Sequence, residues 1–486
     1  MIGLLIDKGR VDIEQLYKST AWVFISAIAY LIVVWPSPAE LFFASSSYFS
    51  SFSINIFGVQ LVIYLVVGWC LSIILLRLIL SQQEIEVKKK IYLAISVSAN
   101  LIILAFFKYF DFFINSAEGL VSSFGGNIEL FHLNVILPVG ISFYTFQTMS
   151  YSLDIYRGKI KSTDHFLDFA LFVAYFPQLV AGPIERASNL LPRILNRRIV
   201  SYDQITRGGF LIFWGLFKKI AIADGVASSV NSIYNTTGNV SSLDVILATV
   251  FFAIQIYCDF SAYSDIARGT SKLMGIELMR NFNLPYFSKN PSEFWQRWHI
   301  SLSSWLRDYL YIPLGGNRGG NLTTYRNLMI TMLLGGLWHG AAWNYVLWGA
   351  YQGIILSVHR YFSIGKEECK QISIFRSALK IVLFFLVTCY GWLLFRATSF
   401  SQITDFTLVL LTGWSDFSLT IKRPPLVVFI SLPLLILYET IEYKTQNVLF
   451  YRTLIKPILG GSVAFILLCI AMGLSNDPTQ FIYFQF

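Results

Sequence analysis

Two histidines draw attention because both lie in apolar surroundings. His339 belongs to residues 333–353, a segment otherwise apolar enough to lie in a bilayer, and His299 lies among tryptophans 40 residues earlier. An imidazole with a pKa near neutrality can take the proton of a hydroxyl or thiol during nucleophilic attack. Ionisable residues at membrane depth are rare and usually functional. The pair therefore indicates acid–base chemistry of the kind used in acyl transfer, with satisfied core histidines as the alternative.

Metal binding and serine catalysis fit the sequence less well. The two histidines have no HExxH motif, clustered carboxylates or cysteine ligands near them, so a zinc site is not expected. The sequence also contains no GxSxG elbow and no Walker A motif. An enzyme of this kind would lack a serine nucleophile of its own and would need an activated acyl donor as a substrate, with no permanently bound cofactor.

Glycines occupy the helical turn that precedes His339. On a helix the imidazole leans over that turn, where Gly336 and Gly335 stand three and four residues back. The missing side chains leave either a groove for a slim substrate or a surface for close packing of another helix, a common use of glycine pairs in membranes. Both interpretations stay open.

Residues 294–320 predict an amphipathic helix. Its aromatic face groups Trp295, Trp298, Leu302, Trp305, Leu306 and Tyr309, and its polar face groups Arg297, Ser301, Ser304 and Asp308. On the same wheel His299 lies on the flank of the aromatic face and points into protein or lipid. Asp308 is expected to orient His299 or Arg307 by hydrogen bonding. An interfacial belt of tryptophans and arginine is the alternative interpretation.

The composition indicates an all-α polytopic membrane protein. Of its 486 residues, 55% are hydrophobic and 13% charged, whereas soluble domains have roughly 25% charged residues. We expect one integrated domain, residues 1–486, with about eleven transmembrane helices besides re-entrant and amphipathic helices. The predicted spans lie near residues 21–36, 54–80, 92–114, 134–155, 208–232, 244–267, 327–344, 346–362, 377–397, 425–443 and 457–474, with a loop at 397–425.

Basic loops predict the orientation of these helices. Residues 86–90, 156–161 and 192–198 are rich in lysine and arginine and should face the cytoplasm. They do so together if residues 166–183 dip into the membrane and return. This count places the N-terminus and residues 268–326 on the cytoplasmic side and the C-terminus outside. The net charge of +9 is spread over such loops, so nucleic acid is not an expected partner.

Two long motifs resemble the membrane-bound O-acyltransferase (MBOAT) family, and within it the bacterial alginate and peptidoglycan O-acetyltransferases. They are EFWQRWHISLSSWLRDYLYIPLGGNRGG (293–320) and LLGGLWHGAAWNYVLWGAYQG (333–353). Supporting matches are ILPVGISFYTFQTMSYSLDIYRG (136–158), LVAGPIERASNL (179–190) and YCDFSAYSDIARG (257–269). The similar motifs span a core of about residues 90–360, together with the C-terminal hexamer 481–486.

The resemblance implies a catalytic mechanism and a central tunnel through the membrane. It implies that His339 is the buried catalytic histidine and that His299 occupies the second motif position. The candidate donor- and substrate-binding residues are Trp298, Trp305, Asp308, Arg318, Gly335, Gly336 and Trp338. Residues 314–320, with Arg318, could cradle the phosphates of coenzyme A, although a plain glycine turn is the simpler interpretation.

The same resemblance implies the reaction and the partner. Acetyl groups would pass from cytosolic acetyl-CoA across the bacterial cytoplasmic membrane to an extracytoplasmic SGNH-type acetyltransferase, which acetylates polysaccharide hydroxyls. The alternative function is a non-catalytic carrier or flippase for lipid-linked saccharide, whose tunnel and histidines would serve transport. The two differ over acetyl-CoA, which only the enzyme would consume.

The C-terminal hexamer FIYFQF has a single hydroxyl, that of Tyr483. An aromatic anchor at the membrane interface is one interpretation. The hexamer also resembles a terminal motif in which a tyrosine is proposed to carry the acyl group. A phenol with a pKa near ~10 forms a more activated ester than a sugar alcohol does, so onward transfer would be favourable. Tyr483 is therefore a candidate acyl relay.

Overall fold

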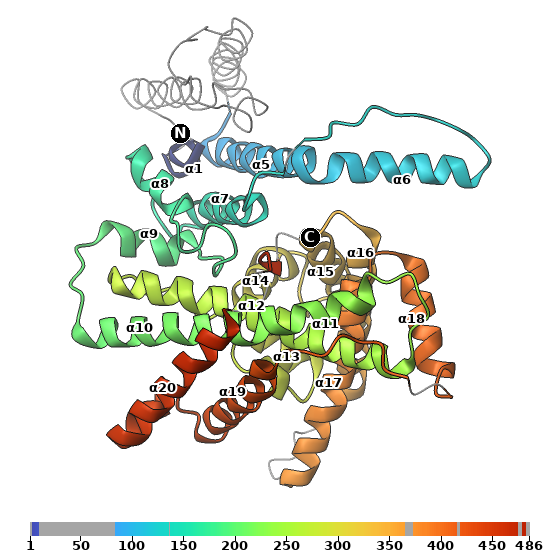
Figure 1. The fold of residues 1–486 in the computed structure, drawn as a ribbon. Coiled ribbons are helices and arrows are strands. Elements are labelled where there is room, and N and C mark those ends of the chain that lie inside the picture. The colour runs from blue at the N-terminus through green and yellow to red at the C-terminus, as the bar shows by residue number, and fades with distance from the viewer. Residues whose placement is uncertain are drawn as a thin grey trace, which may run out of the picture. The chain divides into compact units, whose positions relative to one another are not determined.

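The computed structural model describes residues 2–8, 83–135, 137–364, 373–415, 418–474 and 479–482. Every regular element in these residues is a helix (Figure 1), which confirms the all-α prediction. Within the described ranges, the segments long and apolar enough to cross a membrane are Ile85–Ser123, Ser242–Leu273, Ile374–Arg396, Leu426–Thr445 and Lys456–Gly473. Each coincides with a predicted span, whereas the predicted spans 21–36 and 54–80 lie outside the described residues. The total of about eleven crossings stays a prediction.

One compact unit combines the described residues within Met1–Ile103, Gln147–Ala174 and Arg186–Leu195. Its described helices are α1 (Ile2–Lys8), α5 (Ile85–Leu104), most of α7 (Ile141–Tyr156), α8 (Phe166–Val173) and α9 (Ala187–Leu195). Short polar side chains join α5 to α7. The hydroxyl groups of Ser96 and Ser152 lie 2.7 Å apart, and Thr148 donates to the amide oxygen of Asn100 at 2.5 Å. The predicted re-entrant segment 166–183 begins with the short helix α8.

The other unit combines Leu104–Phe146, Tyr175–Glu185 and Asn196–Phe486. Its first helices are η1 (Ala105–Tyr109), α6 (Phe110–Ser123), α10 (Tyr202–Leu216), η2 (Phe217–Ala223), α11 (Asp224–Tyr234) and α12 (Ser242–Leu273). The central ones are η3 (Pro285–Phe287), α13 (Pro291–Arg297), α14 (Ile300–Leu306), η4 (Arg307–Tyr311), α15 (Gly320–His339) and α16 (Trp343–Ser363). The last are α17 (Ile374–Arg396), α18 (Phe400–Thr412), α19 (Leu426–Thr445), η5 (Phe450–Thr453) and α20 (Lys456–Gly473).

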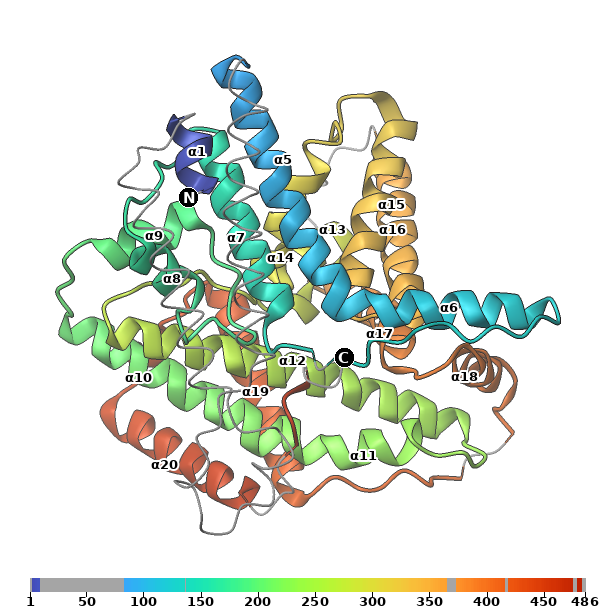
Figure 2. The same ribbon diagram turned by 90° about the horizontal axis from the view of Figure 1, so that it is seen from above.

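Helices α10 and α12 lie side by side in both ribbon views (Figure 1, Figure 2). Gly208 and Gly269 meet where they cross. A Cβ added to Gly269 would lie 2.6 Å from the carbonyl oxygen of Gly208, and one added to Gly208 would lie 2.9 Å from the carbonyl oxygen of Gly269. Glycine at both positions therefore lets the two backbones touch.

The helix predicted over residues 294–320 is wrong as one continuous element. Helices α13 and α14 are separated by Trp298 and His299, and His299 adopts φ 42° and ψ 54°. Backbone hydrogen bonds to an earlier segment hold this break, because the N–H of Ile300 donates to the carbonyl oxygen of Asn281 at 2.9 Å. The π-helix η4 follows α14 and changes the periodicity again. A helical wheel drawn through His299 therefore misplaces it.

The predicted loop at 397–425 is also wrong in part, because it contains α18 (Phe400–Thr412), a short apolar helix. The helix begins after Ser399, whose side chain accepts a hydrogen bond from the N–H of Gln402 at 3.1 Å. A serine at this position followed by glutamine three residues later is a sequence signal for a helix start.

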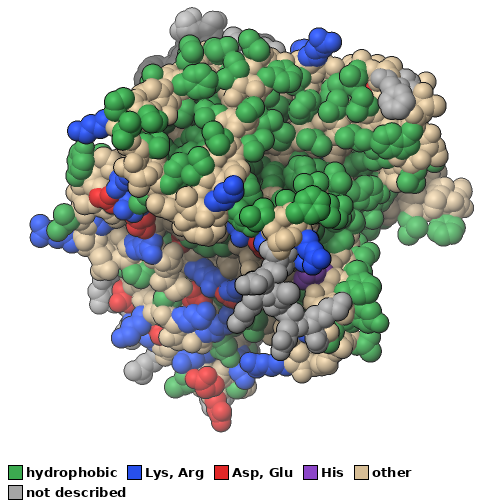
Figure 3. Space-filling model, turned by 90° about the horizontal axis from the view of Figure 1, so that it is seen from below, with side chains coloured by type: hydrophobic (Ala, Val, Ile, Leu, Met, Phe, Trp, Pro, Cys, Tyr) green, Lys and Arg blue, Asp and Glu red, His purple; other side chains and the backbone are tan. Residues whose placement is uncertain are grey.

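Hydrophobic side chains cover a broad area of the surface drawn in Figure 3. Large apolar residues are exposed on the membrane-span candidates, among them Leu383 of α17, Ile436 of α19 and Leu468 of α20. Exposed apolar surface on this scale marks contact with lipid or with other proteins. It agrees with helices that face the bilayer.

Candidate active site

The predicted histidine pair comes together at one side chain, Trp338. The ring centroids of His299 and Trp338 lie 6.0 Å apart, and those of Trp338 and His339 lie 5.1 Å apart, both in edge-on geometry. His299 is 0% exposed and His339 is 6% exposed. Residues 40 positions apart in the sequence therefore form one buried cluster.

A hydrogen bond to the amide oxygen of Asn281 fixes the imidazole of His299. The Oδ1 atom of Asn281 lies 3.1 Å from Nδ1 of His299 and accepts a hydrogen bond from the hydroxyl of Ser301 at 2.9 Å. An amide oxygen only accepts, so Nδ1 carries the hydrogen and the lone pair belongs to Nε2. Burial lowers the pKa of His299 well below its ordinary value. The neutral imidazole is thus the stable form.

Aromatic rings surround His339, which is the last residue of α15. Its ring centroid lies 5.1 Å from that of Trp348 and 5.4 Å from that of Phe395, both nearly perpendicular. These contacts restrict the rotation of the imidazole. Helices α15, α16 and α17 each contribute a ring to this enclosure.

The backbone around His339 is held by Lys108 and Tyr109 of the π-helix η1. The Nζ atom of Lys108 donates to the carbonyl oxygens of Trp338 at 2.7 Å and His339 at 3.2 Å. The hydroxyl of Tyr109 donates to the carbonyl oxygen of Leu337 at 2.8 Å. A cation suits the C-terminal end of a helix, where the last carbonyl groups lack partners within the helix. Neither residue is among those predicted from the sequence.

The predicted tryptophans belong to the wall around the histidines and not to an exposed belt. Trp298, Trp305 and Trp338 are 2%, 5% and 4% exposed. The ring of Phe146 stacks on Trp305 with centroids 3.9 Å apart and on Trp338 at 5.5 Å. Trp298 packs against Trp392 at 4.8 Å. The interfacial-belt interpretation of residues 294–320 is therefore wrong for Trp298 and Trp305.

The two glycines before His339 differ in what they contact. A Cβ added to Gly336 would lie 2.2 Å from the carbonyl oxygen of Tyr345 and 3.1 Å from Cα of Gly349, so this glycine serves close packing of α15 on α16. A Cβ added to Gly335 would meet only Cδ1 of Leu306, at 3.3 Å. For Gly336 the helix-packing alternative is the one that the structure supports.

Asp308 and Arg318 take part in local interactions. The carboxylate of Asp308 pairs with Arg307, with Nε and Oδ1 2.7 Å apart. Arg307 is one of the two partners predicted for Asp308. The other predicted partner, His299, instead has Asn281 at its Nδ1 atom. Arg318 is exposed in the turn that follows η4. Asn327 holds that turn by donating to the carbonyl oxygens of residues 314 and 316, both at 3.1 Å.

The end of the described chain is attached to α12. Tyr483 lies outside the described residues, but the N–H of Ile482 donates to Oδ2 of Asp259 at 2.7 Å. Lys219 forms ion pairs with Asp259 at 2.9 Å and with Asp224 at 2.8 Å. The residue before Tyr483 is therefore held by a buried carboxylate.

Aromatic contacts connect this attachment to the histidine cluster. The ring centroid of Phe481 lies 6.3 Å from that of Phe260, and Phe260 packs edge-on against His299 at 4.7 Å. One phenylalanine ring thus separates the described C-terminal segment from His299.

Residues 157–400, about half of the chain, match the sequence profile of the family described as "MBOAT, membrane-bound O-acyltransferase family". The matched region contains both histidines, Asn281, Trp298, Trp305 and Trp338.

Individual relatives agree with this match. The chain is 44% identical over 307 residues to a "probable alginate O-acetylase" of Pseudomonas aeruginosa, which covers 63% of this chain and 57% of that protein. It is 38% identical over 346 residues to a peptidoglycan O-acetyltransferase of Helicobacter pylori, covering 65% and 64%. A teichoic acid D-alanyltransferase of Bacillus subtilis is 28% identical over 289 residues, covering 55% and 70%. The match thus spans less than two thirds of the first two relatives.

Proposed function

Because the chain belongs to the membrane-bound O-acyltransferase family, we propose that it moves acetyl groups from cytosolic acetyl-CoA across the membrane for O-acetylation of an extracytoplasmic polysaccharide. The observation that carries this proposal is the buried contact of His299 and His339 with Trp338 inside the matched region. Relatives named for the O-acetylation of alginate and of peptidoglycan support acetyl as the group transferred and a polysaccharide as its final acceptor.

The chain is a multi-pass membrane protein, as its family and its long apolar helices indicate. We place it in the bacterial cytoplasmic membrane with the N-terminus inside and the C-terminus outside. In this orientation a central tunnel lets the acetyl group cross without the coenzyme. An SGNH-type acetyltransferase outside would then receive it.

His339 acts as the general base in the proposed reaction. It takes the proton of the acceptor hydroxyl while that oxygen attacks the thioester carbonyl of acetyl-CoA. The carbon–sulfur bond breaks, and the leaving sulfur takes the proton back from the imidazolium, so free coenzyme A and an acetate ester are the products. Lys108 holds the backbone of His339, and the rings of Trp348 and Phe395 hold its imidazole for this transfer.

His299 supports the reaction from beside Trp338. Its neutral imidazole presents the Nε2 lone pair as an acceptor, because Asn281 binds the hydrogen on Nδ1. The acceptor hydroxyl that we favour is the phenol of Tyr483, which would carry acetyl outward as an activated ester. The residue before it in the sequence, Ile482, donates its N–H to Asp259 at 2.7 Å.

The proposal is tested with the full chain purified in detergent and supplied with acetyl-CoA labelled in the acetyl group. We expect release of free coenzyme A together with label on the protein or on an added acceptor. Binding of acetyl-CoA without either product would contradict an acyltransferase.

A further inference from the structure

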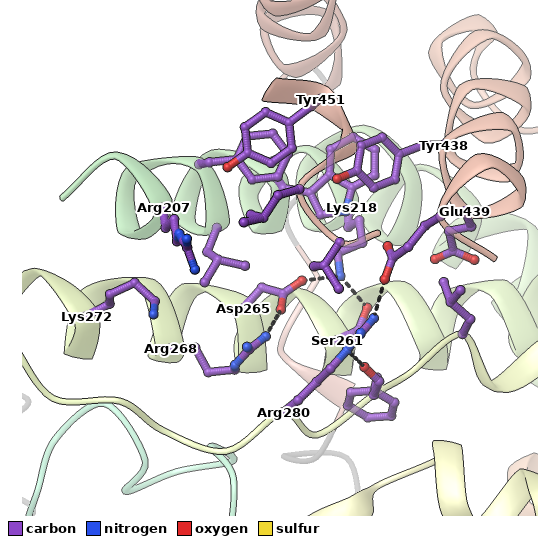
Figure 4. A pocket seen from close by; sticks show the side chains of 18 of the residues that line it. Arg207, Lys218, Ser261, Asp265, Arg268, Lys272, Arg280, Tyr438, Glu439 and Tyr451 are labelled. Carbon is purple, nitrogen blue, oxygen red and sulfur yellow. Dashed lines mark hydrogen bonds and ion pairs between the residues drawn. The ribbon is translucent and has the colours of Figure 1, made fainter. Parts of the chain in front are cut away.

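A cavity of about 250 Å3 lies between α10, α12 and α19, and neither histidine lines it (Figure 4). It is somewhat smaller than the roughly 300–1,000 Å3 of sites that hold a whole drug-sized ligand. The cavity therefore suits one end of a larger molecule, and its lining indicates the chemistry of that end.

Positive side chains outnumber negative ones in the lining. The cations are Arg207, Lys218, Arg268, Lys272 and Arg280, and the carboxylates are Asp265, Glu439 and Glu442. In Figure 4 the side chains of Arg207, Arg268 and Lys272 lie together at one end of the cavity. This grouping is the feature that an anion would recognise.

The helix crossing explains why these cations gather. Arg207 and Arg268 each precede a glycine of the crossing, Gly208 and Gly269, whose backbones touch. Lys272 follows Arg268 by four residues and so lies on the same face of α12. Close approach of α10 and α12 thus brings three cations to one end of the cavity.

Two carboxylates of the lining form ion pairs with the other two cations, Lys218 and Arg280. Lys218, which is 3% exposed, donates to Asp265 at 2.8 Å and to Ser261 at 2.7 Å. Arg280 pairs with Glu442 at 2.7 Å. These two cations belong to the walls of the cavity.

Of the three grouped cations, only Arg268 forms an ion pair with a carboxylate of the lining. Arg268 shares Asp265 with Lys218, at 3.3 Å, and its buried Nε–H has no hydrogen-bond acceptor among the described residues. Arg207 and Lys272 pair with Asp203 and Glu277, and neither of these acids lines the cavity. An anion in the cavity could therefore bind Arg207 and Lys272 without displacing a carboxylate of the lining, and could bind Arg268 through a donor that Asp265 does not occupy.

We propose that this cavity binds a phosphate ester, with Arg207, Arg268 and Lys272 as the ligand-facing cations. Guanidinium groups match phosphate oxygens in a two-pronged geometry, and lysine adds a point charge. The cavity is also close to the histidine cluster, because its lining residue Phe282 packs against Trp298 with ring centroids 5.0 Å apart. The ring of Phe282 also lies 6.4 Å from that of His299, so one aromatic residue separates this part of the lining from the histidine cluster.

Coenzyme A is the source of the phosphate that we favour, a choice that rests on the proposed function. The predicted orientation places residues 268–326 on the cytoplasmic side, where acetyl-CoA is found. A phospholipid headgroup has the same phosphate-ester chemistry and is the other source. The experiment therefore has separate arms for the two.

The test measures equilibrium binding of radiolabelled coenzyme A to the full chain in detergent. The double variant Arg268→Gln with Lys272→Gln should weaken binding by about tenfold or more, since each loses a charge-assisted hydrogen bond. Pantetheine, which lacks phosphate, should bind the variant and the unmodified chain equally. Arg268→Lys, which keeps the charge, should lose less affinity than Arg268→Gln. The matched control is Arg376→Gln at the exposed start of α17, which should change nothing.

The lipid arm measures retention of phosphatidylglycerol by the same variants, using native mass spectrometry. Loss of coenzyme A binding supports the site with the donor as ligand, and loss of phosphatidylglycerol alone supports it with a lipid headgroup. If the double variant keeps the wild-type affinity for both, the inference is overturned. Thermal unfolding identifies a variant that fails to fold, and Arg207→Gln then replaces it.

Failure of this inference is distinguishable from failure of the proposed function. Normal acetyl transfer with an unchanged KM for acetyl-CoA in the double variant would remove the site and leave the function. If the chain binds coenzyme A in a charge-dependent way but transfers no acetyl group, the site stands and the proposed function is overturned.

Discussion

The amide oxygen of Asn281 lies 3.1 Å from Nδ1 of His299. The backbone of Asn281 contributes as well, because its carbonyl oxygen accepts from the N–H of Ile300 at 2.9 Å. One residue thus stabilises both the break between α13 and α14 and the tautomer of the buried imidazole. The first prediction follows from this relationship.

Asn281→Asp should move the acidic limb of the pH–rate profile to higher pH. Burial keeps the pKa of His299 low in the unmodified chain, so the imidazole is neutral over the working range. A carboxylate beside Nδ1 favours the imidazolium and raises that pKa. The neutral form, and with it acetyl transfer, is then lost at a higher pH as the solution is acidified. The measurement is the rate of acetyl transfer between pH values of about 5 and 8.

Asn281→Ala is the matched control for charge. It removes the hydrogen bond without adding a carboxylate, so it should lower the rate without raising the acidic limb. An Asp variant whose limb coincides with that of the unmodified chain would contradict the role given to Asn281.

Lys108→Met should reduce both stability and acetyl transfer. The substitution keeps a long apolar side chain but removes the donor to the carbonyl oxygens of Trp338 and His339. Leaving such acceptors unpaired costs about 1–3 kcal/mol. The thermal unfolding midpoint in detergent and the transfer rate are the measurements. Lys90→Met, on the exposed part of α5, is the control, and equal behaviour of the two variants would exclude an anchoring role for Lys108.

The glycines before His339 should respond differently to alanine. Gly336→Ala places a Cβ 2.2 Å from the carbonyl oxygen of Tyr345 and must separate α15 from α16, whereas Gly335→Ala meets only Leu306 at 3.3 Å. Overpacking of this kind destabilises a protein by about 1–3 kcal/mol. We therefore expect a lower unfolding midpoint and a loss of activity for Gly336→Ala. The second should stay close to the unmodified chain. The reverse order would contradict the packing described for α15 and α16.

Hydrophobic runs and motif resemblance predicted the all-α chain and the positions of its long apolar helices. They failed at His299, because the break there depends on Asn281, 18 residues earlier, and no periodicity reports such a contact. Lys108 was missed for the same reason, since the carbonyl oxygens it binds are 230 and 231 residues away. Helix α18 is different, because the local pair Ser399 and Gln402 could have indicated its start.

Tyr483→Phe should stop transfer to the extracytoplasmic acceptor while acetyl-CoA binding is kept. The substitution retains the ring and any interfacial anchoring but deletes the nucleophilic oxygen. Mass spectrometry of the C-terminal peptide should find an added acetyl group in the unmodified chain during turnover and none in the variant. Normal acetylation of polysaccharide by the Phe variant would leave the hydroxyl without a chemical role.

The most direct test of the account is the rate at which His339→Ala transfers acetyl from labelled acetyl-CoA. His339 lies at the end of α15, enclosed by Trp348 and Phe395, and no other side chain is given the role of base. Loss of a general base lowers the rate by about 10²- to 10⁴-fold. We expect a loss of this size in a variant that still folds, inserts and binds acetyl-CoA. A folded His339→Ala protein that transfers acetyl at the unmodified rate would contradict the central claim.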